Sequence, residues 1–308
     1  MRDVFIRELE KQVENNSRII LITGDLGFGV LDRFQSKFPK NYINAGVAEQ
    51  NMTGIAAGLA LEGRIVFTYS IGNFPTLRCL EQIRNDICYH NLNVNIVSIG
   101  AGFSYGALGM SHHATEDLSI MRSLPEMTVI SPCGSWETEN ATREVISFNS
   151  PTFLRLDKSE GDDSPISDMN EKFTIGKGRK LSDGKDCAIF VTGGILEEVQ
   201  KSVSILKKEN IDASIFALHT VKPLDKDLII STCKKMKCVV TVEEHNITGG
   251  LGSAISEILM DHNVRVNNFL RIGLNDEYSS IVGSQQYLRE QYKMDYKSIV
   301  KKIKHLMN

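Results

Sequence analysis

The sequence predicts an α/β protein built from two parallel-sheet domains. Short β-rich runs alternate with longer helical patterns through most of the 308 residues, as they do in chains that form parallel sheets. Several of the β-rich runs are apolar at nearly every position, which is typical of strands that helices cover on both faces. An acidic stretch poor in apolar residues, at about 158–165, separates two sets of alternating elements and predicts a surface connection.

The first domain is expected at residues 1–157. Its strands are expected at 19–22, 64–69, 94–99, 127–130 and 152–156. Its helices are expected at 2–15, 49–62, 75–90, 117–123 and 135–148. Each β-rich run is short and followed by a helical pattern, so the strands are expected to run parallel.

A linker at 158–172 is expected to lead into a smaller, doubly wound domain at 173–308. Its strands are expected at 187–192, 213–217, 238–242 and 266–272, and its helices at 195–208, 225–235 and 252–260. Gly193-Gly194 and the glycines of 249–252 each follow a strand and precede a helix, where a phosphate loop is one interpretation. Tight strand-to-helix turns explain them as well, since no established phosphate-binding motif is present.

Composition and charge narrow the class of protein. The formal net charge is −3, so no basic face for nucleic acid is expected. The N-terminal segment 1–10 has the pattern of an amphipathic helix interrupted by charges, unlike a secretory signal or a membrane span. We therefore expect a cytoplasmic protein. Six cysteines without a Cys-x-x-Cys pair are expected to be reduced, buried side chains, with no metal site on this chain.

One acidic residue begins an otherwise apolar helix. Glu49 precedes a run in which Gly54 and Gly58 lie one turn apart, so that another backbone can approach the helix closely. A carboxyl sheltered from water holds its proton more readily, as a group that relays protons must. The alternative is that Glu49 only complements the positive end of the helix dipole.

The segment Gly46-Val47-Ala48-Glu49-Gln50-Asn51-Met52 resembles the thiamine-diphosphate signature of the transketolase family. The resemblance implies that Glu49 is catalytic and binds the aminopyrimidine of the cofactor. Its protonated carboxyl would favour the imino tautomer, which removes the thiazolium proton. The cofactor then does the carbon chemistry, while the protein sets its protonation state.

The resemblance covers nearly the whole chain, but only the last two of the family's three domains. The Gly-Asp-Gly run of the diphosphate-binding domain is absent. A second polypeptide, the N-terminal transketolase subunit, is therefore expected to hold the diphosphate and most of the contacts to Mg²⁺ (or Ca²⁺ or Mn²⁺). An α2β2 heterotetramer is the simplest assembly. Segments 219–225 and 242–245 resemble fold and dimer-interface elements, which implies self-dimerisation.

Further cofactor contacts follow from the resemblance. Phe74 matches the aromatic residue that stacks on the aminopyrimidine, and Ile71 stands where another ring is frequent. Asp25 lies in a segment that matches the family's Asp-Leu turn. An aromatic face supplies offset stacking beyond simple burial. A core phenylalanine at a strand end is the alternative for Phe74.

A glycine-rich loop supplies the substrate side of the expected site. His112 matches the histidine that faces the thiazolium and a substrate oxygen, which implies proton transfer or alkoxide stabilisation. His113 replaces the usual glutamine and is also expected near the substrate. The two histidines with Glu116 and Asp117 could instead be metal ligands or serve only the loop, although no zinc-type spacing is present.

The departures from the family pattern concern the substrate. Gly100 and Leu108 stand where a histidine and a hydroxyl-reading aspartate occur in transketolases, and Gly29 stands in place of a phosphate-binding serine. Arg2 and Arg155 match arginines that grip substrate phosphate, which suits an arginine fork. Either arginine could instead pair with a surface carboxylate. Because Leu108 cannot hydrogen-bond a donor hydroxyl, poor activity on ordinary pentose phosphates is expected.

The sequence therefore predicts a subunit of a split, thiamine-diphosphate-dependent transketolase-like enzyme that transfers a two-carbon unit from a ketose or keto donor to an aldehyde or ketone. A second interpretation is a 2-keto acid decarboxylating acyl transferase, or a synthase of a deoxysugar or branched sugar from pyruvate. A third is a non-catalytic scaffold subunit. Donor, acceptor and metal are not fixed by this chain.

Overall fold

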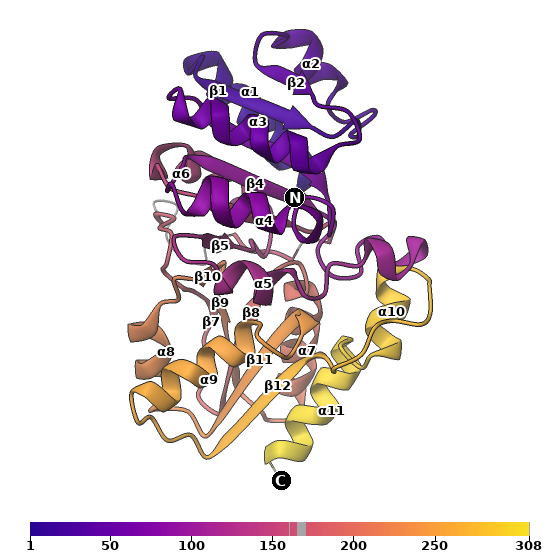
Figure 1. The fold of residues 1–308 in the computed structure, drawn as a ribbon. Helices are drawn as coiled ribbons and strands as arrows, with labels where there is room; N and C mark the ends of the chain where they lie inside the picture. The colour runs from indigo at the N-terminus through magenta and orange to yellow at the C-terminus, as the bar shows by residue number, and fades with distance from the viewer. Residues whose placement is uncertain (160, 165–170, 308) are drawn as a thin grey trace.

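Two domains are arranged one above the other in a computed structural model that describes residues 1–159, 161–164 and 171–307. Figure 1 shows the first domain, coloured indigo to magenta, in the upper half and the second, orange to yellow, in the lower half. Each domain contains one mostly parallel sheet, so the predicted fold class is confirmed. No helix among the described residues is long and apolar enough to cross a membrane.

The first domain is built on a seven-stranded sheet in the order β10-β5-β6-β4-β3-β1-β2. Its own strands are β1 (Ile19–Thr23), β2 (Tyr42–Asn44), β3 (Ile65–Ile71), β4 (Val94–Ile99), β5 (Thr128–Ile130) and β6 (Thr152–Leu156). These six strands run parallel, so their carboxyl ends meet at one edge of the sheet, where α/β proteins place their ligands.

Helices cover this sheet on both faces. They are α1 (Arg2–Asn15), α2 (Asp32–Lys37), α3 (Glu49–Leu61), α4 (Leu80–Gln82), α5 (Asp117–Ser123) and α6 (Ser135–Phe148). The helical segment expected at about 75–90 is present from 77 to 88, but its helix type changes twice. That stretch is a 3₁₀ turn η1 (Leu77–Cys79), then α4, then a π-helix η2 (Ile83–Cys88). The residues joined by each backbone hydrogen bond are thus three, then four, then five positions apart, a change that apolar spacing does not reveal.

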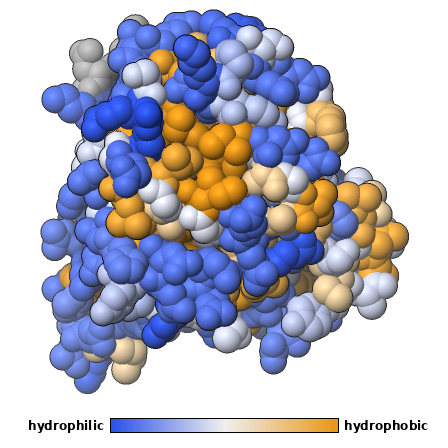
Figure 2. Space-filling model, turned by 45° about the horizontal axis from the view of Figure 1, so that its top comes forward, coloured by the Kyte–Doolittle hydropathy of each residue, from blue (hydrophilic) through white to orange (hydrophobic). Residues whose placement is uncertain are grey.

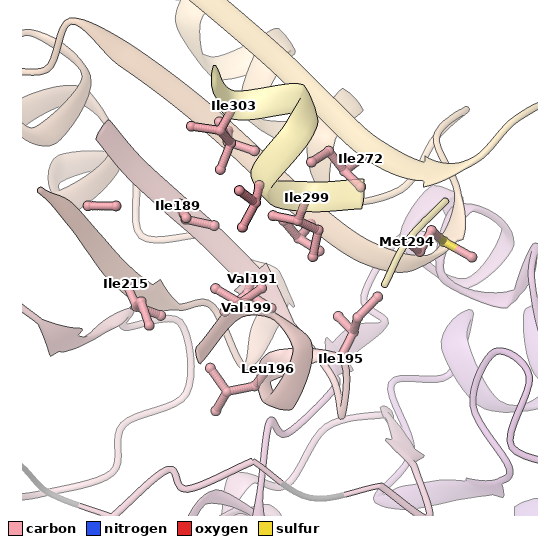
Figure 3. Close-up of a cluster of buried hydrophobic side chains, with 14 of the residues drawn as sticks. Ile189, Val191, Ile195, Leu196, Val199, Ile215, Ile272, Met294, Ile299 and Ile303 are labelled. Carbon is pink, nitrogen blue, oxygen red and sulfur yellow. The ribbon is translucent and has the colours of Figure 1, made fainter. Parts of the chain in front are cut away.

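The second domain contains a five-stranded sheet in the order β12-β11-β8-β9-β7. Its strands are β7 (Arg179–Ser182), β8 (Cys187–Thr192), β9 (Ala213–Ala217), β11 (Cys238–Asn246) and β12 (Asn268–Leu274). Its helices are α7 (Leu196–Lys208), α8 (Lys226–Cys233), α9 (Leu251–Asp261), α10 (Gln285–Gln291) and α11 (Tyr296–Met307). Figure 3 shows Ile299 and Ile303 of α11 reaching the same apolar core as Ile189 and Val191 of β8.

One strand of the second half belongs to the first sheet. β10 (Thr220–Lys222) pairs antiparallel with β5, Thr220 opposite Ile130, and the backbone N–H of Ser131 donates to the carbonyl of His219 at 2.7 Å. The segment 219–225, expected to be a fold and interface element, therefore joins the two domains of one chain. The boundaries at 157 and 173 stay a prediction, and the expected linker includes residues 160 and 165–170, which lie outside the described residues.

A buried histidine beside this strand predicts a pH dependence of stability. His219 is fully buried and stacks on Phe173 at a ring distance of 4.2 Å. Burial, followed by the charge of Arg179, lowers the pKa of His219 from 6.5 to about 3. Above pH 6.5 the histidine is neutral in both the folded and the unfolded state. Between about pH 6.5 and 3 the unfolded chain takes up a proton that the folded chain does not, so the free energy of unfolding decreases as the pH is lowered. The parent loses unfolding free energy when the pH is lowered from 7.5 to 4.5, and we expect this loss to be about 2–3 kcal/mol smaller in the His219→Gln variant.

The measurement is the free energy of unfolding in urea at both pH values, for the parent and the His219→Gln variant. The buried His245, whose pKa burial also lowers, keeps its own contribution in both proteins. Equal pH dependence in the two proteins would contradict the prediction.

Candidate active site

Three side chains expected to be functional meet at the carboxyl edge of the first sheet. α3 begins at Glu49, whose side chain is only 3% exposed. Its carboxylate oxygen Oε2 accepts a hydrogen bond from Nη1 of Arg78 at 2.8 Å. The Arg78 guanidinium lies 4.8 Å from the ring centroid of Phe74, and the Phe74 ring meets that of His112 edge-on at 5.2 Å. Glu49, Phe74 and His112 thus form one continuous cluster through Arg78.

The turns after β1 and β2 hold the start of α3 in place. Asn44 ends β2, and its side-chain oxygen accepts from the backbone N–H groups of Asp25 and Gly46, each at 3.0 Å. Its amide in turn donates to the Asp25 carboxylate at 2.9 Å. A Cβ on Gly24 would lie 3.5 Å from Cγ of Glu49, so the turn that carries Asp25 lies against the buried glutamate. The Asp25 side chain itself is exposed.

The end of β3 determines where Ile71 and Phe74 lie. Ile71 is the last residue of this strand and is half-buried. The chain then turns, with Gly72 donating to the carbonyl of Ile99 at 2.8 Å, and brings the half-buried Phe74 to the carboxyl edge of the sheet. Ile71 is therefore close in sequence to the cluster, whereas the contacts to His112 and Arg78 are made by the ring of Phe74.

The loop after β4 contains an aromatic residue that sequence reasoning missed. Gly100 has a φ of +99°, and a Cβ there would lie 2.2 Å from ring atoms of Tyr105. The Tyr105 ring thus fills the space of the side chain that Gly100 lacks. It lies 6.5 Å from the ring of His112, and Lys158 Nζ lies 4.0 Å from its centroid. Where transketolases carry a histidine, this chain presents a tyrosine from a neighbouring position.

His112 and His113 point to different surroundings. His112 is half-buried, and its Nδ1 lies 3.1 Å from the hydroxyl of Ser111. His113 is 2% exposed, packs edge-on against Phe103 at 5.0 Å and places Nε2 3.3 Å from the carbonyl of Gly106. Burial lowers the pKa of His113, so this ring is neutral at pH 7. His112 is the more accessible of the two side chains, and the substrate roles of both histidines stay predictions.

A separate cavity of about 320 Å³ lies next to His113. Asn73, Met110, Glu116 and Tyr278 are among its lining residues. No group of three histidine, cysteine or acidic side chains among the described residues is arranged to hold a metal ion.

Arg155 occupies a position that does not fit its expected role. Its side chain is 1% exposed, and Nε donates to Asp117 at 2.8 Å. Nη2 donates to the carbonyl oxygens of Ala114 at 2.7 Å and of Glu244 at 3.0 Å. The interpretation of Arg155 as a phosphate-binding residue stays a prediction that this position does not favour, because its guanidinium is turned inward and joins α5 and the loop before it to β11.

Arg2 remains accessible, and Leu108 lies on the surface. Arg2 pairs with Asp3 at 2.9 Å and lines a cavity of about 350 Å³ together with Gly29. It also lines a cavity of about 400 Å³ with Lys158. Leu108, in the 3₁₀ turn η3 (Gly106–Leu108), is 55% exposed. Lys158 was not singled out from the sequence, since a lone lysine after a strand carries no motif.

Comparison with known proteins places the chain in a family. Residues 1–162 match the family described as the transketolase pyrimidine binding domain, and residues 176–299 match the transketolase C-terminal domain. A putative transketolase C-terminal section from Methanocaldococcus jannaschii is 40% identical over 298 residues, covering 96% of this chain and 92% of that protein. The 6-deoxy-6-sulfo-D-fructose transketolase subunit SqwH from Clostridium sp. strain MSTE9 is 34% identical, covering 98% and 92%.

Solved structures agree with this result. The structure described as a split gene transketolase, inactive beta4 tetramer, is similar with a TM-score of 0.89 and 31% identity, covering 99% of this chain and 97% of that one. A transketolase from Pichia stipitis has a TM-score of 0.81 at 18% identity, with 45% of that chain covered, and supports the fold alone.

The chain belongs to the transketolase family. Its extent matches the separate C-terminal subunits within that family, so the predicted resemblance is confirmed. It is a subunit of a split transketolase-like transferase that uses thiamine diphosphate and acts with a partner subunit. The relatives do not favour the decarboxylating or scaffold interpretations.

Proposed function

We propose that Glu49 and Phe74 hold the aminopyrimidine of thiamine diphosphate. The observation that carries this proposal is the joint position of a buried carboxyl and an aromatic face at the carboxyl edge of the sheet. This donor set fits a flat heterocycle with nitrogen atoms on its edge, since a carboxyl hydrogen-bonds the edge and a ring stacks on the face. We assign Ile71 and the turn containing Asp25 to the same site, since this turn lies against Glu49 and Ile71 precedes Phe74 at the end of β3.

In this arrangement Glu49 works as a protonated carboxyl that donates its proton at Oε2 to a ring nitrogen. Thiamine diphosphate supplies the nucleophilic carbon that breaks and forms carbon–carbon bonds. His112, 5.2 Å from the Phe74 ring, donates a proton to the substrate oxygen and removes it again in the reverse direction. The His112 side chain is only half-buried, so it remains partly accessible.

The partner is an N-terminal transketolase subunit that holds the diphosphate and its divalent metal, in an α2β2 assembly. The surface of α3 supports this proposal. Cβ atoms placed on Gly54 or Gly58 would have no neighbour within 4 Å, while Val47 is 74% and Leu61 65% exposed at the two ends of the helix. Figure 2 shows an apolar area near the middle of one face of the molecule, surrounded by hydrophilic side chains. Such a face is suited to another protein surface.

The substrate is proposed to be a keto donor with an anionic end. Arg2 and Lys158 line the same cavity, and Tyr105 connects Lys158 to His112. Burial, followed by the positive charge of Arg2, lowers the pKa of Lys158. An anion between them would neutralise both charges. By resemblance, Leu108 replaces the aspartate that reads a donor hydroxyl, so ordinary pentose phosphates are expected to be poor donors.

Lys158→Met is expected to raise the KM for an anionic donor about tenfold, because one of two cations that face the anion is lost. The value of kcat should change less than threefold. Steady-state kinetics of the assembled enzyme with the anionic donor measures both constants, and the uncharged form of the same donor is the control, for which KM should not move. An unchanged KM for the anionic donor would exclude Lys158 from the site.

The proposed function is tested by reconstitution. The chain is co-expressed with an N-terminal section that carries Gly-Asp-Gly, and the pair is assayed with thiamine diphosphate and Mg²⁺. A ketose phosphate and an acceptor aldehyde should exchange a two-carbon unit without release of carbon dioxide. Carbon dioxide release from pyruvate, with no exchange between sugars, would instead indicate decarboxylating chemistry. Failure of the two chains to co-purify would contradict the proposed assembly.

A further inference from the structure

Arg78 occupies the place that the proposed function gives to the aminopyrimidine. It donates from Nη1 to Oε2 of Glu49 at 2.8 Å, and its guanidinium lies 4.8 Å from the Phe74 centroid. A guanidinium is flat, carries N–H groups along its edge and stacks on aromatic faces. The edge of Arg78 thus meets the proposed hydrogen-bonding acid, and its face meets the proposed stacking ring.

We propose that Arg78 and the aminopyrimidine compete for Glu49 and Phe74, so that Arg78 sets the affinity of the site for thiamine diphosphate. This inference rests on the proposed function. The side chain occupies the site from within, holds Glu49 as a carboxylate and moves out when the cofactor enters. Release of Arg78 leaves Oε2 of Glu49 free for a hydrogen bond to a ring nitrogen of the cofactor.

The surroundings of Arg78 allow this movement. Its side chain is 49% exposed, in contrast to Glu49 at 3%, so the guanidinium can turn toward solvent while the carboxylate cannot. Within the described residues, Glu49 is its one ion-pair partner and Phe74 its one ring contact. Arg78 lies in the 3₁₀ turn η1, where the backbone is not held by a regular α-helical ladder. Displacement therefore breaks one ion pair and one stacking contact.

The competition has a quantitative consequence. When a side chain occupies a binding site for most of the time, the apparent dissociation constant of the ligand rises by the inverse of the free fraction. If Arg78 fills the site nine times in ten, its removal tightens cofactor binding about tenfold, or about 1.4 kcal/mol. If Arg78 stabilised the bound cofactor, its removal would weaken binding. If it only supported the fold, its removal would leave the affinity of the folded protein unchanged.

The test is the dissociation constant of thiamine diphosphate, measured by isothermal titration calorimetry on the co-purified pair of subunits with Mg²⁺. Arg78→Met keeps the length and the apolar stem but removes the charge and the flat fork, and should bind the cofactor about tenfold more tightly. Arg78→Lys keeps the charge without the fork and should lie between this variant and the parent. Arg84→Met is the matched control, since Arg84 is exposed and hydrogen-bonds the neighbouring Asn85, and it should bind like the parent.

Unchanged or weaker binding by Arg78→Met, in a pair whose parent binds the cofactor and whose unfolding free energy is unaltered, would overturn this inference and leave the proposed function standing. Absence of cofactor binding by the parent pair would instead overturn the proposed function. The two failures are therefore distinguishable, and the readout does not depend on turnover.

Discussion

Glu49→Gln is expected to lower kcat of the assembled enzyme by at least about a thousandfold, equivalent to about 4 kcal/mol of transition-state stabilisation. The amide is nearly the same size as the carboxyl and still donates a hydrogen bond, so the pocket keeps its shape. An amide cannot share an acidic proton with a ring nitrogen, and this is the role that the buried position of Glu49 supports. Steady-state turnover at saturating cofactor is the measurement.

Glu62→Gln is the control for this prediction. Glu62 caps the other end of α3 and is exposed, so its loss should leave kcat within twofold of the parent. If Glu49→Gln kept more than a tenth of the parent's turnover, the catalytic assignment would be wrong and a scaffold role for this chain would gain support.

Arg155→Met is expected to lower the free energy of unfolding by about 3–5 kcal/mol, since it leaves the carboxylate of Asp117 buried without its cation. Asp117 is fully buried, and Arg155 also satisfies two backbone carbonyl oxygens, those of Ala114 and Glu244. Urea denaturation measures the change. Lys304→Met is the control, because Lys304 pairs with Glu209 at the surface and exposed pairs contribute under about 1 kcal/mol.

The same variant separates a structural from a substrate role for Arg155. If Arg155 has a structural role, the Arg155→Met variant, assayed at a low temperature at which it remains folded, should keep the KM of the parent for an anionic donor. A large rise in KM without loss of stability would instead support the interpretation that Arg155 binds the substrate phosphate. The inward direction of the guanidinium in the structure favours the first result.

The sequence was sufficient to predict the two sheets and the neighbourhood of Glu49, Phe74 and His112. Apolar runs of parallel strands are easily recognised, and the three residues follow the ends of strands that meet at one sheet edge. The role of each of these residues stays a prediction. Three-residue β10 carries too little pattern to be recognised, and its pairing with β5 depends on a contact between distant segments.

Other parts of the site depend on side-chain direction, which a pattern of residue types does not contain. Arg155 aligns with a phosphate-binding arginine, but Asp117 draws its guanidinium inward. Tyr105 fills the space at Gly100 because that glycine takes a positive φ. Arg78 reaches Glu49 from a turn interrupted by changes of helix type. In each case a single neighbouring residue decides where the functional group points.

The exchange of β10 into the first sheet determines how the molecule is able to deform. Because the ladder between Thr220 and Ile130 is made of main-chain hydrogen bonds, moving the second domain away from the first sheet would require separating β10 from β5. A hinge motion between the two domains therefore costs the main-chain hydrogen bonds of this ladder. The movement proposed for Arg78 needs no such separation, because it breaks only one ion pair and one ring contact within the first domain.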